Sequence, residues 1–96
     1  MSASRISRAD VEQRLRTVKS IGAHNGITIF TYYGSTLESL EIHASSGTYW
    51  LQAGRPGESG AEQIGQPRGL KEIDLYLQGM SAGYDAIRHT KQHRAE

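Results

Sequence analysis

The strongest constraint on the fold is a long amphipathic pattern near the C-terminal end of the chain. Apolar residues recur there at steps of three and four, at Leu70, Ile73, Leu77, Met80, Tyr84 and Ile87. This spacing predicts an α-helix over about residues 70–91 with one apolar face. Gly79 and Gly83 in its interior each cost roughly 1 kcal/mol relative to alanine. We therefore expect another backbone to come close to them, as when a helix lies tightly on a sheet.

A second, shorter helical pattern lies near the N-terminus. Ser7 is a good N-cap, and the charge of Asp10 suits the positive end of the helix dipole. Apolar side chains follow at helical spacing, at Val11, Leu15 and Val18. Gly22 ends the pattern, so the sequence predicts a helix over about residues 8–21.

Between the helices, three runs rich in β-branched and aromatic residues are separated by turn residues. They are ITIFTYY (27–33), TLESLEIH (36–43) and TYWLQA (48–53), with GS and ASSG between them. A two-residue loop and then a four-residue loop predict registers in which Ile42 faces Tyr49 and Leu40 faces Leu51. Both loops agree on one inner face of Ile27, Ile29, Leu40, Ile42, Tyr49, Leu51 and Ala53. We predict one α+β domain over residues 1–96: helix, three-stranded antiparallel sheet, and long C-terminal helix packed on one sheet face.

The opposite face of the predicted sheet carries an unusual aromatic group, Phe30, Tyr32 and Trp50. Three interpretations are open: the first helix covers the group, it binds a protein partner, or it stacks on single-stranded nucleic acid. Stacking platforms need a basic surround, and residues 27–53 contain no lysine or arginine. Tryptophan and tyrosine dominate the energetics of protein interfaces. We therefore predict a protein-binding surface at these residues, used by a homodimer or by another protein.

The segment GRPGESGAEQIGQPRG (54–69) holds both prolines and five of the eleven glycines. Its glycines fit neither G-x-G-x-x-G nor G-x-x-x-x-G-K-[ST], so these nucleotide-binding loops are rejected. Arg55 and Arg68 flank the segment, and Arg68 precedes a predicted helix N-terminus, where free backbone amides favour an anion. The segment is otherwise expected to be a mobile loop of about fifteen residues.

No catalytic, metal or cofactor site is predicted. The chain lacks cysteine, which removes disulfides, thiolate zinc sites and a cysteine nucleophile. His89 and His93 stand four residues apart, but on a charged helix end without a neighbouring H-E-x-x-H. No secretory signal and no apolar run of about 18 residues is present, so a cytoplasmic location in the host cell is expected. We predict that the protein is not an enzyme.

The run QPRGLKEIDLYLQGMSAGYDAIR (66–88) resembles the closing helix of a loose class of small accessory proteins encoded by tailed phages and prophages. In that class a Gly/Pro-containing loop leads through a basic residue and KE into a helix with an L-x-G-M/F-x-A-G pattern. The preceding order of helix, three short strands and loop is also similar. Members are mostly of unassigned function, and many small phage accessory proteins inhibit a host or defence component. The resemblance assigns no functional residue.

Three functions therefore compete. The first is a protein-binding inhibitor from a phage or mobile element, similar to an anti-CRISPR protein, and the near-neutral net charge of +1 is compatible with it. The second is a sponge that sequesters an anionic small molecule such as a cyclic nucleotide at Arg55 and Arg68. The third is nucleic-acid binding by the first helix, because the first twenty residues hold five basic side chains against two acidic ones. We favour the first function, because two arginines per chain supply too few hydrogen-bond donors and too little positive charge for a strong phosphate site.

Overall fold

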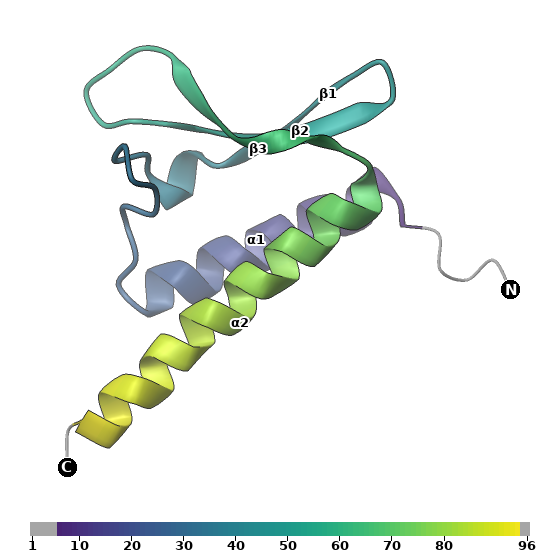
Figure 1. Cartoon of the computed structure of the whole chain (residues 1–96). Helices are drawn as coiled ribbons and strands as arrows, with labels where there is room; N and C mark the ends of the chain where they lie inside the picture. The colour runs from purple at the N-terminus through teal and green to yellow at the C-terminus, as the bar shows by residue number, and fades with distance from the viewer. Residues whose placement is uncertain (1–5, 95–96) are drawn as a thin grey trace, which may run out of the picture.

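The computed structural model describes the backbone of residues 6–94 and the side chains of residues 6–87. It consists of one layer of two helices beneath one layer of sheet (Figure 1). The elements are α1 (Arg8–His24), the 3₁₀-helix η2 (Leu37–Ser39), β1 (Glu41–Ser45), β2 (Thr48–Gly54), β3 (Ala61–Arg68) and α2 (Leu70–Arg94). The three-stranded sheet is antiparallel in the order β1-β2-β3. The predicted α+β class is confirmed, with both helices on the same sheet face, called here the inner face.

The identity of one strand differs from the prediction. Residues 27–33 form no strand of the sheet and share only one isolated bridge, between Ile29 and Thr36. β3 instead lies inside the segment predicted to be a mobile loop, and it pairs with β2. The open edge of β1 is partly covered, since the Arg8 guanidinium donates to the Ile42 carbonyl at 3.2 Å. β3 is held to β2 by backbone hydrogen bonds, with an irregular register between Tyr49 and Leu51. Because β3 is an edge strand, it tolerates Pro67, which has no backbone N–H to donate.

The β1–β2 connection is shorter than predicted. Ser46 and Gly47 form the turn with φ of 52° and 84°, so the loop has two residues rather than four. Ile42 accordingly pairs with Leu51 and not with Tyr49. The shift is an even number of residues, so the inner face keeps the same side chains. Leu40, Ile42, Leu51 and Ala53 are buried as expected, whereas Ile29 is half exposed.

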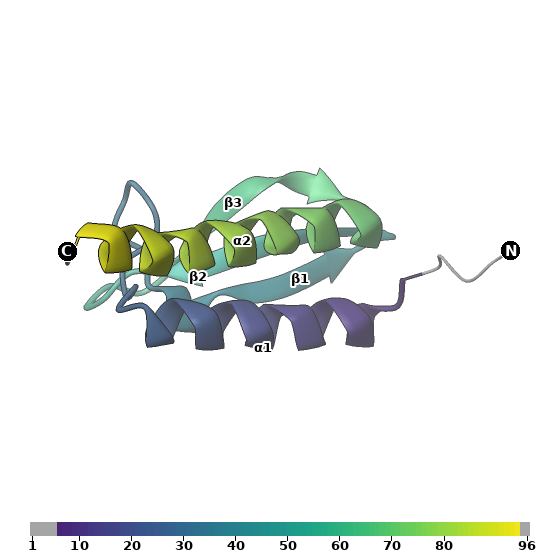
Figure 2. The ribbon, with the colours of Figure 1, turned by 90° about the horizontal axis from the view of Figure 1, so that it is seen from below.

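The helices run parallel to each other across the inner face (Figure 2). One core cluster joins them to the sheet, and its buried members are Val11, Leu15, Val18, Leu37, Leu40, Ile42, Leu51, Ala53, Ile73 and Leu77. At the N-terminus of α1, Ser7 accepts from the Asp10 amide and Asp10 accepts from the Ser7 amide, which completes a capping box. Between the helices, Arg14 donates to buried Asp74 at 2.5 Å. The long helix therefore packs on the inner face as predicted.

The structure reverses the expected roles of the helix glycines. Gly79 and Gly83 have no heavy atom within 4 Å of an added Cβ, so no backbone approaches them among the described residues. Gly22 does not end α1, which continues to His24, and Gly22 is buried in its last turns. A Cβ at Gly22 would lie 2.2 Å from Cδ2 of Leu37. The close helix contact that requires a glycine therefore lies between Gly22 of α1 and Leu37 of η2.

Candidate functional site

The predicted aromatic group does not form one cluster on the outer sheet face. Trp50 lies there on β2, stacked on the His43 ring with a centroid separation of 6.0 Å, and its indole N–H donates to Gln52 at 2.7 Å. Phe30 is half-buried and packs against the core instead. Tyr32 lies outside the sheet with 96 % of its surface exposed. The three residues were grouped by assuming that 27–33 is a strand, and that assumption is wrong. α1 lies on the inner face and leaves the outer face uncovered (Figure 1).

Residues 27–36 form a folded loop, called here the tyrosine loop, that connects the C-terminal end of α1 to η2. Its own backbone closes it: the Phe30 amide donates to the Ser35 carbonyl at 3.0 Å, and the Gly34 amide donates to the Thr31 carbonyl at 3.1 Å. Gly34 has φ of 90°, a conformation that glycine adopts without strain. The turn therefore spans residues 31–34 rather than Gly34-Ser35 alone.

A polar cluster fixes the tyrosine loop to β3. The Ser35 side chain is fully buried, and its hydroxyl donates to the Glu62 carboxylate. Thr31 donates to the same carboxylate oxygen at 3.1 Å and accepts from the Ser35 amide at 2.8 Å. Buried polar groups that are satisfied in this way hold a segment in one arrangement. The cluster therefore ties both ends of the turn between Thr31 and Ser35 to β3.

A second set of bonds joins the C-terminal end of the loop to β2 and the N-terminal end of the loop to η2. The Thr36 amide donates to the Gly54 carbonyl at 2.8 Å, and the Leu37 amide donates to the Thr28 carbonyl at 3.0 Å. The Ser39 hydroxyl accepts from the Gly54 amide at 2.8 Å. Both ends of the tyrosine loop are consequently anchored to regular structure.

The tip of the loop exposes large side chains. Tyr32 and Tyr33 are 96 % and 64 % exposed, and their rings meet edge to face with centroids 5.4 Å apart. Ile29 is half exposed on the same loop. Tyrosines supply large contact area at a low cost in side-chain entropy, because they have only two rotatable χ angles. The loop therefore presents a preformed apolar and hydrogen-bonding surface.

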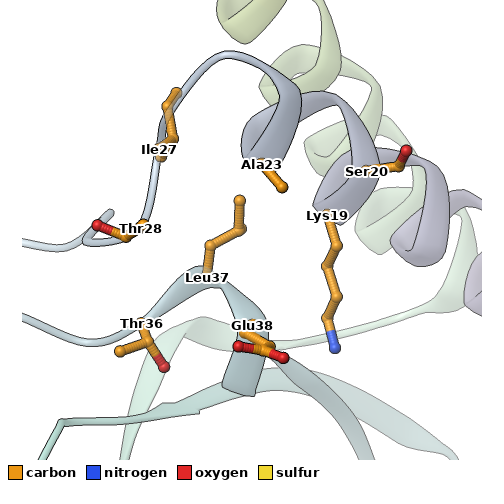
Figure 3. A pocket seen from close by; sticks show the side chains of 8 residues that line it. All are labelled: Lys19, Ser20, Ala23, Ile27, Thr28, Thr36, Leu37 and Glu38. Carbon is orange, nitrogen blue, oxygen red and sulfur yellow. The ribbon is translucent and has the colours of Figure 1, made fainter.

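A pocket of about 510 Å³ lies at the base of the tyrosine loop (Figure 3). Ala23 of α1, Ile27 and Leu37 give it apolar walls, and Lys19 and Glu38 stand at its rim. Its volume falls within the range of about 300–1,000 Å³ typical of ligand sites. Thr28 and Thr36, at the two ends of the loop, also line it, so the pocket and the tyrosines share one segment.

The two arginines of the predicted anion site lie at opposite ends of the β2–β3 hairpin. Arg55 follows β2 and pairs with Glu58 at 2.8 Å, so its charge is already partnered. Arg68 lies at the other end, opposite Tyr49. The strand between these ends, from Tyr49 to Gly54, spans roughly 17 Å. The two arginines therefore do not form a ready-made pair in one chain, and an anion site at Arg55 and Arg68, which was expected above all in a dimer, stays a prediction.

Residues 6–87 contain no group of three or more side chains that could hold a metal ion. The side chains of His89 and His93 lie outside the described residues. Burial, and then the nearby phenol of Tyr76, raises the pKa of Tyr84, which packs against the core. This shift belongs to packing, because Tyr84 packs against the core and does not line the pocket at the base of the tyrosine loop.

Comparisons with known proteins do not assign the chain to a family. No family model, curated protein or solved structure matches the chain. Within the described residues, no helix is both long enough and apolar enough to cross a membrane.

Several residues of the site were missed from the sequence. The sequence predicts Tyr33 to be a strand residue and Ser35 to be half of a hairpin turn, whereas both belong to the tyrosine loop. Glu62 lies in a segment that was expected to be mobile. Gly34 and Ser35 are typical turn residues, and they were the only local indication in the sequence of a loop at this position. No local pattern connects those residues to Glu62, which is 27 residues away from Ser35.

Proposed function

We propose that this is a non-enzymatic accessory protein that binds another protein through the tyrosine loop. One observation carries the proposal: Tyr32 is almost fully exposed on a loop whose backbone is anchored by the buried Ser35 and Glu62 contact. An exposed tyrosine on a rigid loop loses little further entropy when it binds, so more of its contact energy appears as affinity. Tyrosine is also among the residues enriched at interface hot spots.

The cellular role we propose is inhibition of a host or defence component by a phage or mobile element. It rests on the resemblance of residues 66–88 to phage accessory proteins. The near-neutral net charge of +1 is compatible with an interface anchored by large side chains rather than by charge. Relative to the sequence prediction, Tyr32 stays in the proposed surface and Tyr33 joins it. Phe30 leaves it because it packs against the core, and Trp50 leaves it because it lies on the outer sheet face.

The test is affinity capture from the native host, with partners identified by mass spectrometry. The Tyr32→Ser, Tyr33→Ser double variant should lose the partner that the wild-type protein recovers. Tyr76→Ser is the control, because Tyr76 is an exposed tyrosine on α2, away from the loop, although its exposed fraction of 44 % is lower than those of Tyr32 and Tyr33. Its recovery should equal that of the wild type, and all three proteins should show the same helix content by circular dichroism. Full recovery of the partner by a folded double variant would refute the proposal.

A further inference from the structure

The pocket at the base of the tyrosine loop has a lining suited to one apolar side chain. Leu37, which is only 2 % exposed, forms its floor, and Ala23 and Ile27 stand on either side (Figure 3). Leu37 also packs against Gly22 of α1, and its amide is bonded to the Thr28 carbonyl. The floor is therefore fixed by core packing and is ready for an occupant before binding.

The rim carries two charges of opposite sign. The ammonium of Lys19 and the carboxylate of Glu38 both lie at the side of the pocket away from Ile27 (Figure 3). Within the described residues, neither forms an ion pair with any other side chain. A ligand with a single charge would be attracted by one of these groups and repelled by the other. A peptide main chain instead offers an acceptor for the ammonium and a donor for the carboxylate at every residue except proline.

From this geometry we infer that the pocket binds one large apolar side chain of a polypeptide partner, with the partner's main chain lying between Lys19 and Glu38. The inference rests on the proposed function and names the chemistry of the partner segment. Ile27, Thr28 and Thr36 of the tyrosine loop form one side of the pocket, so a partner anchored in the pocket contacts the loop that carries the exposed tyrosines.

Blocked single residues test the pocket without any knowledge of the partner. The probes are N-acetyl-L-leucinamide and N-acetyl-L-phenylalaninamide, titrated into the ¹⁵N-labelled full chain and followed by amide chemical shifts. We expect saturable shifts at Ala23, Ile27 and Leu37, with a dissociation constant on the order of millimolar. N-acetylglycinamide, which has the same main chain and no side chain, should cause no saturable shift. Absence of saturable shifts with both apolar probes would overturn the inference.

Single substitutions test whether the probes bind in the pocket and whether Lys19 and Glu38 contact the main chain of the probes. Ala23→Trp fills the pocket and should weaken probe binding at least tenfold, whereas Ala82→Trp, at an exposed alanine of α2 outside the pocket, should leave it unchanged. Lys19→Met and Glu38→Gln should each weaken binding about threefold to tenfold, because each removes one main-chain contact. Toluene, which has no amide groups, is the last control. If toluene binds as tightly as the amide probes and neither rim substitution weakens binding, the pocket recognises only apolar surface, and the proposed main-chain contact is refuted.

The outcomes distinguish this inference from the proposed function. If the tyrosine double variant loses the partner while Ala23→Trp still recovers it, protein binding stands and the pocket inference fails. If probe binding is confirmed but the tyrosine double variant retains the partner, the tyrosine surface fails and the pocket stands. Loss of the partner in both variants, together with saturable probe binding, would support both.

Discussion

Replacement of Gly22 by alanine tests the closest contact of the fold. The new Cβ would stand 2.2 Å from Cδ2 of Leu37, whereas carbon atoms make their best contacts at about 3.5–4.0 Å. The two groups must therefore separate by roughly 1.3 Å or more. The backbone of Leu37 has little freedom to yield, because its amide is bonded to Thr28, so Cδ2 must be displaced by rotation of the side chain toward the pocket. Overpacking of this kind typically costs about 1–3 kcal/mol.

An opposing effect must be included in the expected magnitude. Alanine is favoured over glycine in a helix interior by about 1 kcal/mol, so the net destabilisation by Gly22→Ala is about 0–2 kcal/mol. The coupling to Leu37 is the sharper quantity. In a Leu37→Ala background the clash is absent, and Gly22→Ala should stabilise the protein by up to about 1 kcal/mol. The sign of the effect is therefore expected to reverse between the two backgrounds.

Urea denaturation followed by circular dichroism measures all four proteins of this cycle. The matched controls are Gly79→Ala and Gly83→Ala, at helix glycines with nothing within 4 Å of the added Cβ. Each control should raise the free energy of unfolding by up to about 1 kcal/mol. A stabilisation by Gly22→Ala equal to that of the controls, and unchanged when Leu37 is truncated, would refute the proposed contact between α1 and η2.

Three further predictions concern single polar groups. Arg14→Met should destabilise the protein by about 1–3 kcal/mol in urea denaturation, because it leaves the Asp74 carboxylate buried without its charged partner, and a combined Arg14→Met, Asp74→Leu variant should recover much of the loss. Ser35→Ala should speed hydrogen exchange in the tyrosine loop and leave exchange in α1 unchanged, because it removes one of the two bonds to Glu62; unchanged loop exchange would contradict the anchor. Burial raises the pKa of Tyr84, so the unfolded phenol ionises first, at about pH 10, and stability should fall as the pH rises from there to the folded pKa. Thermal melts of Tyr84→Phe taken across that pH range should lack this loss of stability. If the wild type and Tyr84→Phe show the same dependence of melting temperature on pH, the raised pKa of Tyr84 is contradicted.

The two helices and the β1–β2 hairpin were determined by local sequence. Ser7 and Asp10 form the capping box that their spacing indicated, and the periodic side chains Val11, Leu15 and Val18 are buried in the core. The hairpin kept its inner face although its turn is two residues shorter than expected. An even shift preserves the side of the sheet to which each residue points, so the apolar alternation alone fixed that face.

The third strand and the candidate site were decided only by the tertiary structure. Residues 27–33 have high strand propensity, but Arg8 covers part of the edge of β1, and the segment satisfies its backbone within the tyrosine loop. Residues 61–68 have little apolar alternation and contain Pro67, yet they became a strand because β2 offered an unpaired edge. Strand propensity mostly measures how a side chain fits its neighbours on a sheet, so it cannot indicate which edge will be free. The site depends on the same long-range pairing, because Ser35 meets Glu62 only after β3 has formed.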